Sequence, residues 1–200
     1  MKPIRQILLA VAVILSAHLS QAQEGYLAIR GGYSSTSLNA DGTSDIKLEN
    51  RHTWHMNLVY SRVFKNSMFG FSVEPGYAIR GIETNRDSIS YKFNYLSTPL
   101  LVDFYPIKDL RVGIGPEVSF LLGAKNRKND STKVDITDMY DNVVDISGTI
   151  SVSYSLSFFA DFGFRYNRSF TNIASSDAIL NRRNLANEYV QVFLLLKIAN

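Results

Sequence analysis

Nine ionisable residues lie within stretches of the sequence that otherwise consist of apolar and small residues. In "RVGIGPEVSFLLG" (111–123), Arg111 and Glu117 occupy the same alternate positions as three glycines and a serine. Acids and bases that share one face of neighbouring strands can pair with one another or form a charged constriction for a solute. The nine residues expected on such a face are Arg30, Glu74, Arg80, Asp103, Arg111, Glu117, Asp161, Arg165 and Lys197.

Two histidines, His52 and His55, stand at the polar start of an apolar stretch, where an imidazole can serve as a general base. A hydrolytic site also needs a nucleophile and an orienting group within reach of that base. No recognisable spacing of such partners surrounds the two histidines. We therefore expect surface or interfacial histidines, and an enzyme acting on lipid or peptide is the alternative.

Two acidic stretches match calcium-binding loops only in part. "DITDMYDNVVD" (135–145) lacks the alternating ligand spacing and the glycine of such a loop. "NADGTSD" (39–45) has Asn50 where the loop needs its bidentate acid, and an Asp-Gly turn is the simpler interpretation. The chain has no cysteine, which excludes disulfides, thiolate metal sites and thiol catalysis. We expect no cofactor and no metal site. The aspartates of the first stretch are Asp135, Asp138, Asp141 and Asp145.

These side chains must be positioned by strands, because period-two alternation runs through most of the chain. Short connections at 65–67, 106–109 and 155–157 alternate with longer or more polar ones at 39–52, 84–88, 125–142 and 172–187. Short turns at one end and long loops at the other are typical of an outer-membrane barrel. The eight predicted strands are 25–38, 53–64, 68–83, 89–105, 110–124, 143–154, 158–171 and 188–198.

Alternation alone does not show which face of the strands meets water, because the strands of a soluble lipocalin-like barrel alternate between apolar and polar residues equally well. In "FFADFGFRYN" (158–167), one set of positions is almost wholly aromatic, and the other carries Asp161, Gly163 and Arg165. A soluble protein would present many Lys and Glu side chains on its outer face. Small residues with isolated charges instead suit the narrow interior of an eight-stranded barrel. We therefore predict an all-β, eight-stranded antiparallel transmembrane β-barrel whose inward charges fill the lumen as ion pairs.

The first 22 residues have the three parts of a secretory signal peptide. Lys2 and Arg5 precede an apolar run at 7–15, and small residues follow at 20–22. Residues 23–200 then form one barrel domain in the outer membrane of a Gram-negative cell, with outer-membrane lipid and the barrel insertion machinery as partners. This domain has 19 basic and 18 acidic residues, a net charge of +1, which gives no indication of nucleic-acid binding.

Two segments, "YLSTPLLVDFYPIKDLRVGIGPEVSFLLGAK" (95–125) and "FFADFGFRYNRSFTNI" (158–173), resemble the small outer-membrane β-barrel family of Bacteroidetes, whose members are described as porin-like or PorT-like. The resemblance implies an eight-stranded barrel. Some members of that family assist protein secretion and gliding, which makes an accessory barrel of secretion a further alternative. One departure is the chain end, "LLLKIAN", where such barrels commonly finish on an aromatic residue.

Three prolines, Pro75, Pro99 and Pro116, fall on consecutive predicted strands at similar height. Because proline donates no ladder hydrogen bond, we expect a belt of bulges that bends the wall. A gap in the wall that admits lipid or a partner is the alternative. The resulting functional prediction is a small non-enzymatic barrel with a plugged polar lumen, serving envelope structure, adhesion or the binding of an extracellular or envelope partner.

Overall fold

The computed structural model describes residues 25–41, 48–84, 89–128, 134–137, 142–172 and 183–199. The predicted signal peptide lies outside these residues. Within them, no helix combines the length and the hydropathy that a membrane crossing requires. The strands are β1 (Gly25–Asp41), β2 (Leu48–Val63), β3 (Phe69–Val73), β4 (Gly76–Thr84), β5 (Ile89–Ile107), β6 (Leu110–Lys128), β7 (Val134–Asp135), β8 (Val144–Ser155), β9 (Ala160–Ser169) and β10 (Arg183–Ala199).

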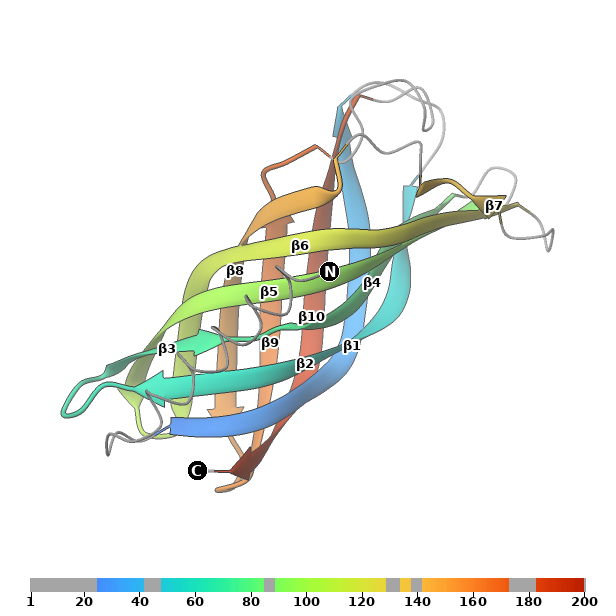
Figure 1. The fold of residues 1–200 in the computed structure, drawn as a ribbon. Coiled ribbons are helices and arrows are strands. Elements are labelled where there is room, and N and C mark those ends of the chain that lie inside the picture. Colours follow the sequence, from blue (N-terminus) through green and yellow to red (C-terminus); the bar gives the residue numbers. More distant parts are fainter. Residues whose placement is uncertain are drawn as a thin grey trace, which may run out of the picture.

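The strands pair in a closed antiparallel ring. β1 pairs with β2, and β2 pairs with both β3 and β4. These two short strands both pair with β5, and the ring then continues through β6, β8, β9 and β10 back to β1. Because β3 and β4 occupy one position, eight strand positions form the wall, which confirms the predicted fold class. Figure 1 shows the strands wound obliquely around a common axis. A closed ring leaves no unpaired edge in the lipid.

Short connections gather at one end of the ring. The chain turns at Lys65–Asn66, at Lys108–Asp109 and over 156–159, and β1 begins and β10 ends at this same end (Figure 1). Asn66 has a φ of 55°, a left-handed conformation that asparagine tolerates in tight turns. By the usual arrangement of outer-membrane barrels, this end is periplasmic and the opposite end is extracellular.

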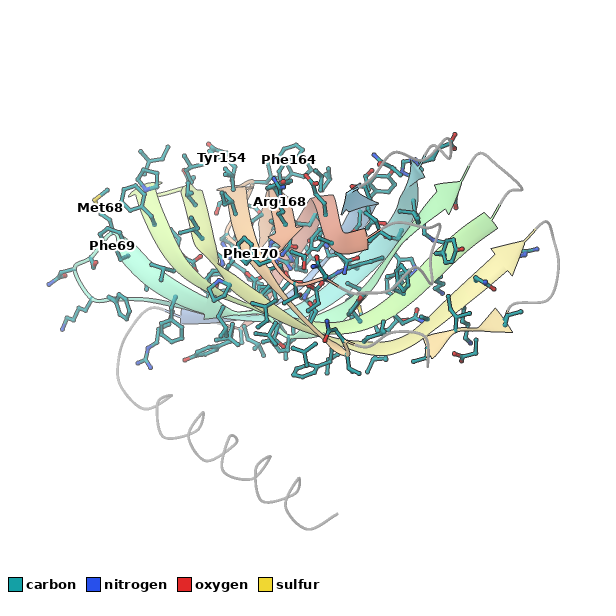
Figure 2. The ribbon with its side chains drawn as sticks, turned by 90° about the horizontal axis from the view of Figure 1, so that it is seen from above. Met68, Phe69, Tyr154, Phe164, Arg168 and Phe170 are labelled. Carbon is teal, nitrogen blue, oxygen red and sulfur yellow. The ribbon has the colours of Figure 1, made fainter. Side chains whose placement is uncertain are left out.

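The wall sorts its side chains by polarity. Outward positions carry large apolar side chains such as Ile114 (58% exposed), Leu122 (60%) and Leu194 (51%). In Figure 2 the labelled Tyr154 and Phe164 project from the outer side of the wall. Inward positions carry serines, threonines and charged groups, with a small apolar cluster near the periplasmic end formed by Ala28, Val59, Phe193 and Leu195. The apolar surface therefore faces lipid.

Several strand limits differ from those predicted. The predicted strand 68–83 is divided into β3 and β4 around Glu74 and Pro75, and β5 continues to Ile107, so the following turn has only two residues. β7, a two-residue strand beside Lys125 and Asn126, lies inside the predicted loop 125–142. Two residues are too few to produce a recognisable alternation.

The predicted belt of proline bulges is wrong. Pro99 stays in register opposite Glu117 and Pro116 opposite Gly148, while the pairing around Pro75 has the same register on both sides of the break. A proline lacks the backbone N–H donor but keeps its carbonyl acceptor. The carbonyl of Pro75 accepts from Leu58 N at 2.8 Å, and that of Pro99 accepts from Glu74 N at 3.0 Å. The register shifts of the β5–β6 pair lie elsewhere, at Asn94/Tyr95 and Phe104/Ile107.

Candidate functional site

The structure places all nine of the predicted ionisable side chains inside the barrel. Eight of these residues are at most 8% exposed, and the side chain of Lys197 near the periplasmic end is 16% exposed. They form two clusters and one separate pair. We call the clusters the Glu74 cluster (Glu74, Arg30, Arg111, Arg165 and Asp103) and the Arg80 cluster (Arg80, Glu117 and Asp145).

The Glu74 cluster is built on the break between β3 and β4. Glu74 Oε2 accepts from Arg30 of β1 and from Arg165 Nη2 of β9, the latter at 2.6 Å. Its Oε1 accepts from Arg111 Nη2 of β6 at 3.1 Å. One fully buried carboxylate therefore joins three other strands of the wall.

Arg111 carries further interactions within this cluster. Its Nε lies 2.9 Å from Asp103 Oδ1, and its terminal nitrogens donate to Ser72 at 2.7 Å and to the Tyr26 hydroxyl at 3.0 Å. Gly113 leaves the space that Asp103 needs, because a Cβ on this glycine would lie 2.7 Å from Asp103 Oδ1. The guanidinium is thus held from β1, β3 and β5 at once.

The Arg80 cluster lies nearer the extracellular end. Arg80 Nη1 donates to Asp145 Oδ2 at 2.9 Å, and Nη2 donates to Glu117 and to Ser119. The rings of Tyr95 and Tyr189 lie 4.6 and 4.8 Å from the guanidinium carbon. An arginine between two aromatic rings gains cation–π attraction in addition to its ion pairs.

Neutral donors satisfy the remaining oxygens of the two acids. Glu117 Oε2 accepts from Tyr189 at 2.6 Å, and Asp145 Oδ2 accepts from Asn187 at 2.8 Å. Further donors reach these carboxylates from Thr149, Asn167, Ser169 and Thr171. A buried ion pair is tolerated when its other lone pairs are satisfied in this way.

Asp145 is the member of this cluster that sequence reasoning did not assign to the interior. In the sequence it stands with Asp135, Asp138 and Asp141 in the stretch that matches a calcium-binding loop in part. The alternation of the strand indicates its inward direction, because Asp145 stands between Val144 and Ile146, which both face lipid. The structure buries Asp145 to 3% exposure against Arg80.

The third group is a pair near the periplasmic end. Lys197 Nζ lies 2.9 Å from Asp161 Oδ1, which also accepts from Ser155 at 2.8 Å. Among the described residues, the two clusters and this pair together contain five basic and five acidic residues, so the charges of these three groups balance. Chemically, this arrangement can fix strand register and fill the lumen.

The two histidines lie on opposite faces of β2. His52 faces outward, where its ring stacks on Tyr33 with centroids 5.5 Å apart. His55 faces inward, is 2% exposed and has its Nδ1 2.9 Å from Ser34 Oγ. Its Nε2 has no hydrogen-bond partner among the described residues. The two imidazoles therefore belong to different environments.

The aspartates of 135–145 do not form one site among the described residues. Asp135 is exposed on β7, and a hydrogen bond from the Thr137 hydroxyl lowers the pKa of its carboxyl, while Asp145 points into the barrel. Asp138 and Asp141, like most of the 39–45 stretch, lie outside the described residues. No group of three or more His, Cys, Asp or Glu residues suited to a metal ion occurs within the part of the chain that the structure describes.

Comparison with known proteins decides the family. Residues 21–175 match the model of the outer membrane protein β-barrel domain. The chain belongs to this family. The protein is therefore located in the outer membrane, where the apolar face of the wall contacts lipid. No curated protein is significantly similar to the chain.

Solved structures agree with this family in fold. The crystal structure of Ail, the attachment invasion locus protein of Yersinia pestis, is 16% identical, with a TM-score of 0.54 over 88% of this chain and 99% of that chain. Neisserial surface protein A (NspA) of Neisseria is 10% identical, with a TM-score of 0.54 over 88% of this chain and 100% of that chain. At these identities the likeness concerns the fold.

Proposed function

We propose that the protein is a non-enzymatic outer-membrane barrel with a closed lumen, which serves attachment at the cell envelope: envelope structure, adhesion, or the binding of an extracellular or envelope partner. The observation that carries the closed lumen in this proposal is the bonding of Glu74 to arginines of three other strands. A carboxylate shared in this way ties opposite walls together. An eight-stranded barrel has an interior just wide enough for side chains, so such a tie closes the passage.

The satisfied carboxylates support a structural role for the interior. A relay for a charged solute needs a site that a moving ion can enter and leave. Glu74 and Glu117 each already accept from several donors, and Arg80 is enclosed by two rings. Passage of an ion would break these contacts at a cost of several kcal/mol for each uncompensated charge.

The placement of the histidines supports a non-enzymatic role. A base acts with a nucleophile and an orienting acid on one side of the wall. His52 and Tyr33 are on the lipid side, and the His55–Ser34 pair is sealed inside, with Gln191 as the further neighbour of Ser34 at 3.3 Å. Neither pair combines access with an orienting acid among the described residues.

Conductance tests the closed lumen. The full-length chain, refolded into planar lipid bilayers, should give no stepwise current, whereas an open porin in the same bilayer gives regular steps. Uniform single-channel steps from the purified wild-type protein would overturn the proposal of a plugged barrel.

Attachment is tested at the extracellular connections. Strands whose described ends lie at that end are linked in the sequence by segments 42–47, 85–88, 129–133 and 173–182. Cells that display the wild-type protein should bind host or envelope material, and replacement of these segments by glycine-serine linkers of equal length should abolish binding while the barrel still folds. Equal binding by both forms would contradict an attachment role of the connections.

We also propose membership of the Bacteroidetes porin-like group and delivery by the barrel insertion machinery. The motifs at 95–125 and 158–173 support the first, and the transmembrane ring supports the second. Affinity capture from the outer membrane of the source cell tests both. Recovery of secretion or gliding components would favour the accessory role that some members of that group have.

A further inference from the structure

Strand β6 changes its neighbour near the extracellular end of the barrel. Leu121 N donates to the Val143 carbonyl oxygen at 2.8 Å, just beyond the end of the β6–β8 pairing. Farther along β6, the short strand β7 pairs with Lys125 and Asn126, and Figure 1 shows β7 beside this end of β6. We call residues 134–137, which include β7, the strap. The strap therefore occupies the edge of β6 that β8 leaves.

Hydrogen bonds centred on Thr137 hold the strap against β6. The Thr137 hydroxyl accepts from Ala124 N at 2.9 Å and donates to Asp135 Oδ1 at 2.6 Å. The same carboxylate oxygen accepts from Thr137 N at 3.0 Å. Ile136 N donates to the carbonyl oxygen of Ala124 at 3.0 Å, so the strap satisfies both backbone groups of Ala124. We call these hydrogen bonds the latch.

Ile136 is buried, although the two residues before it in the strap are exposed. Its exposed fraction is 5%, whereas Val134 is 54% exposed and Asp135 lies on the surface. The backbone contact places Ile136 beside Ala124, which is the register partner of Phe93 on β5. Cross-strand neighbours share a face of a sheet, and Ala124 and Phe93 are both fully buried on the inner face. Ile136 therefore points into the barrel.

Ile136 belongs to an apolar layer on the extracellular side of the Arg80 cluster. Along β4, the next inward residue after Arg80 is Ile82. Along β6, the next inward residue after Ser119, which binds Arg80, is Leu121. Exclusion of water from this side strengthens the buried ion pairs, because a low dielectric increases the attraction between opposite charges. The layer consists of Leu38, Ile82, Phe93, Leu121 and Ile136, each at most 6% exposed.

We propose that the strap is a releasable seal, which closes the extracellular side of the Arg80 cluster with Ile136 and opens when the latch breaks. Ile136 is the member of the apolar layer that lies outside the eight wall positions, so it can leave without opening the ring. The exposed Asp135 and the neighbouring latch groups can exchange their partners for water, and such hydrogen bonds contribute little net stability. Release gives extracellular water and small ions access to Glu117 and Asp145.

The labelling rate of a thiol beneath Ile136 tests the seal. In the full chain, refolded into detergent micelles, Ala124→Cys introduces the single thiol and changes the side-chain volume little. A water-soluble maleimide should label this cysteine slowly while the strap is closed. Addition of Thr137→Val, which removes the latch hydroxyl but keeps the side-chain shape, should raise the labelling rate about tenfold, because two hydrogen bonds are lost. Addition of Ile136→Ala should also raise the rate, because it removes the plug and leaves the latch.

Three controls accompany these variants. Thr98→Val makes the same substitution on the outer face of β5 and should leave the labelling rate unchanged. Val134→Cys, at an exposed position of the strap, gives the rate of an unprotected thiol. Heat-modifiable gel mobility establishes that each variant is folded. The proposal is overturned by equal labelling of Ala124→Cys with and without Thr137→Val, or by labelling of Ala124→Cys as fast as that of Val134→Cys.

Amide hydrogen exchange in the wild-type protein tests the seal without any variant. The Ala124 amide, which donates to Thr137, should exchange through local opening of the strap. Its exchange should be at least about tenfold faster than that of the Leu58 amide, which donates to the Pro75 carbonyl within the wall. Equally slow exchange at both amides would show that the strap is a permanent part of the wall. Stepwise conductance would refute the closed lumen, whereas these labelling and exchange results bear on the seal alone.

Discussion

Glu74 and Arg165, 91 residues apart in the chain, meet across the barrel interior with 2.6 Å between Oε2 and Nη2. Arg30 binds the same oxygen, so one carboxylate atom compensates two guanidinium groups. The contact brings the break between β3 and β4 against the opposite wall. It therefore resists flattening of the barrel in a way that the ladder hydrogen bonds alone do not.

Glu74→Gln should strongly destabilise the barrel. The amide keeps the shape of the side chain but removes the carboxylate that Arg30, Arg111 and Arg165 share; among the described residues, Arg111 then keeps Asp103 as its acidic partner and the other two arginines keep none. Removal of one partner from a buried ion pair typically costs about 3–5 kcal/mol. Urea unfolding in detergent micelles, followed by heat-modifiable gel mobility, measures the loss. The half-exposed Glu83, whose replacement by Gln should change stability by less than about 0.5 kcal/mol, is the control.

Arg80→Lys should destabilise the barrel although it keeps the charge. The ammonium group cannot donate to Glu117 and Asp145 in the fixed fork geometry of a guanidinium while stacked between Tyr95 and Tyr189. Loss of one hydrogen bond between charged groups costs about 1.5–3 kcal/mol. The midpoint of urea unfolding should fall, whereas Arg168→Lys on the outer wall should leave it unchanged. An unaltered midpoint for Arg80→Lys would show that charge alone is sufficient.

Single cysteines should reveal which face of the wall meets lipid, since the natural chain contains none. Cysteine at Ile114, Leu122 or Leu194 should react with a maleimide confined to the bilayer. Cysteine at the buried Ser119 or Ser147 should not react until the protein is unfolded. The reverse labelling pattern would mean that the polar face is the outer one.

Gly163→Ala should lower stability by about 1–3 kcal/mol, the usual range for overpacking. A Cβ at this position would lie 2.5 Å from Phe193 Cζ and 2.6 Å from the backbone oxygen of Val152. The Phe193 ring has Arg30 and Arg165 over its face, so its displacement would also disturb the Glu74 cluster. Gly123→Ala is the matched control, because its nearest atom would be 3.7 Å away. Thermal unfolding in micelles compares the two variants, and equal melting temperatures would show that the ring moves freely.

Period-two alternation was sufficient to assign strands, faces and the inward direction of Arg80 and Glu117. The pairing partner of Arg80 was not predictable, because it depends on tilt and register across the lumen, which alternation does not encode. Asp145 was missed for a related reason: its acidic neighbours in sequence drew attention away from the apolar residues on either side of it. The error at Pro75 and Pro99 came from counting the missing donor without the carbonyl, which still accepts, and Pro116 keeps the register of its strand pair opposite Gly148.

The seam between β1 and β10 has a consequence for biogenesis. Leu27 lies opposite Ala199, so β1 acquires its second neighbour only after β10 is available. Until then both margins of the sheet expose unpaired amide groups, which are templates for aggregation. The nascent polypeptide must therefore be chaperoned as an unfinished ribbon, and truncation within the last strand should direct it to periplasmic proteolysis.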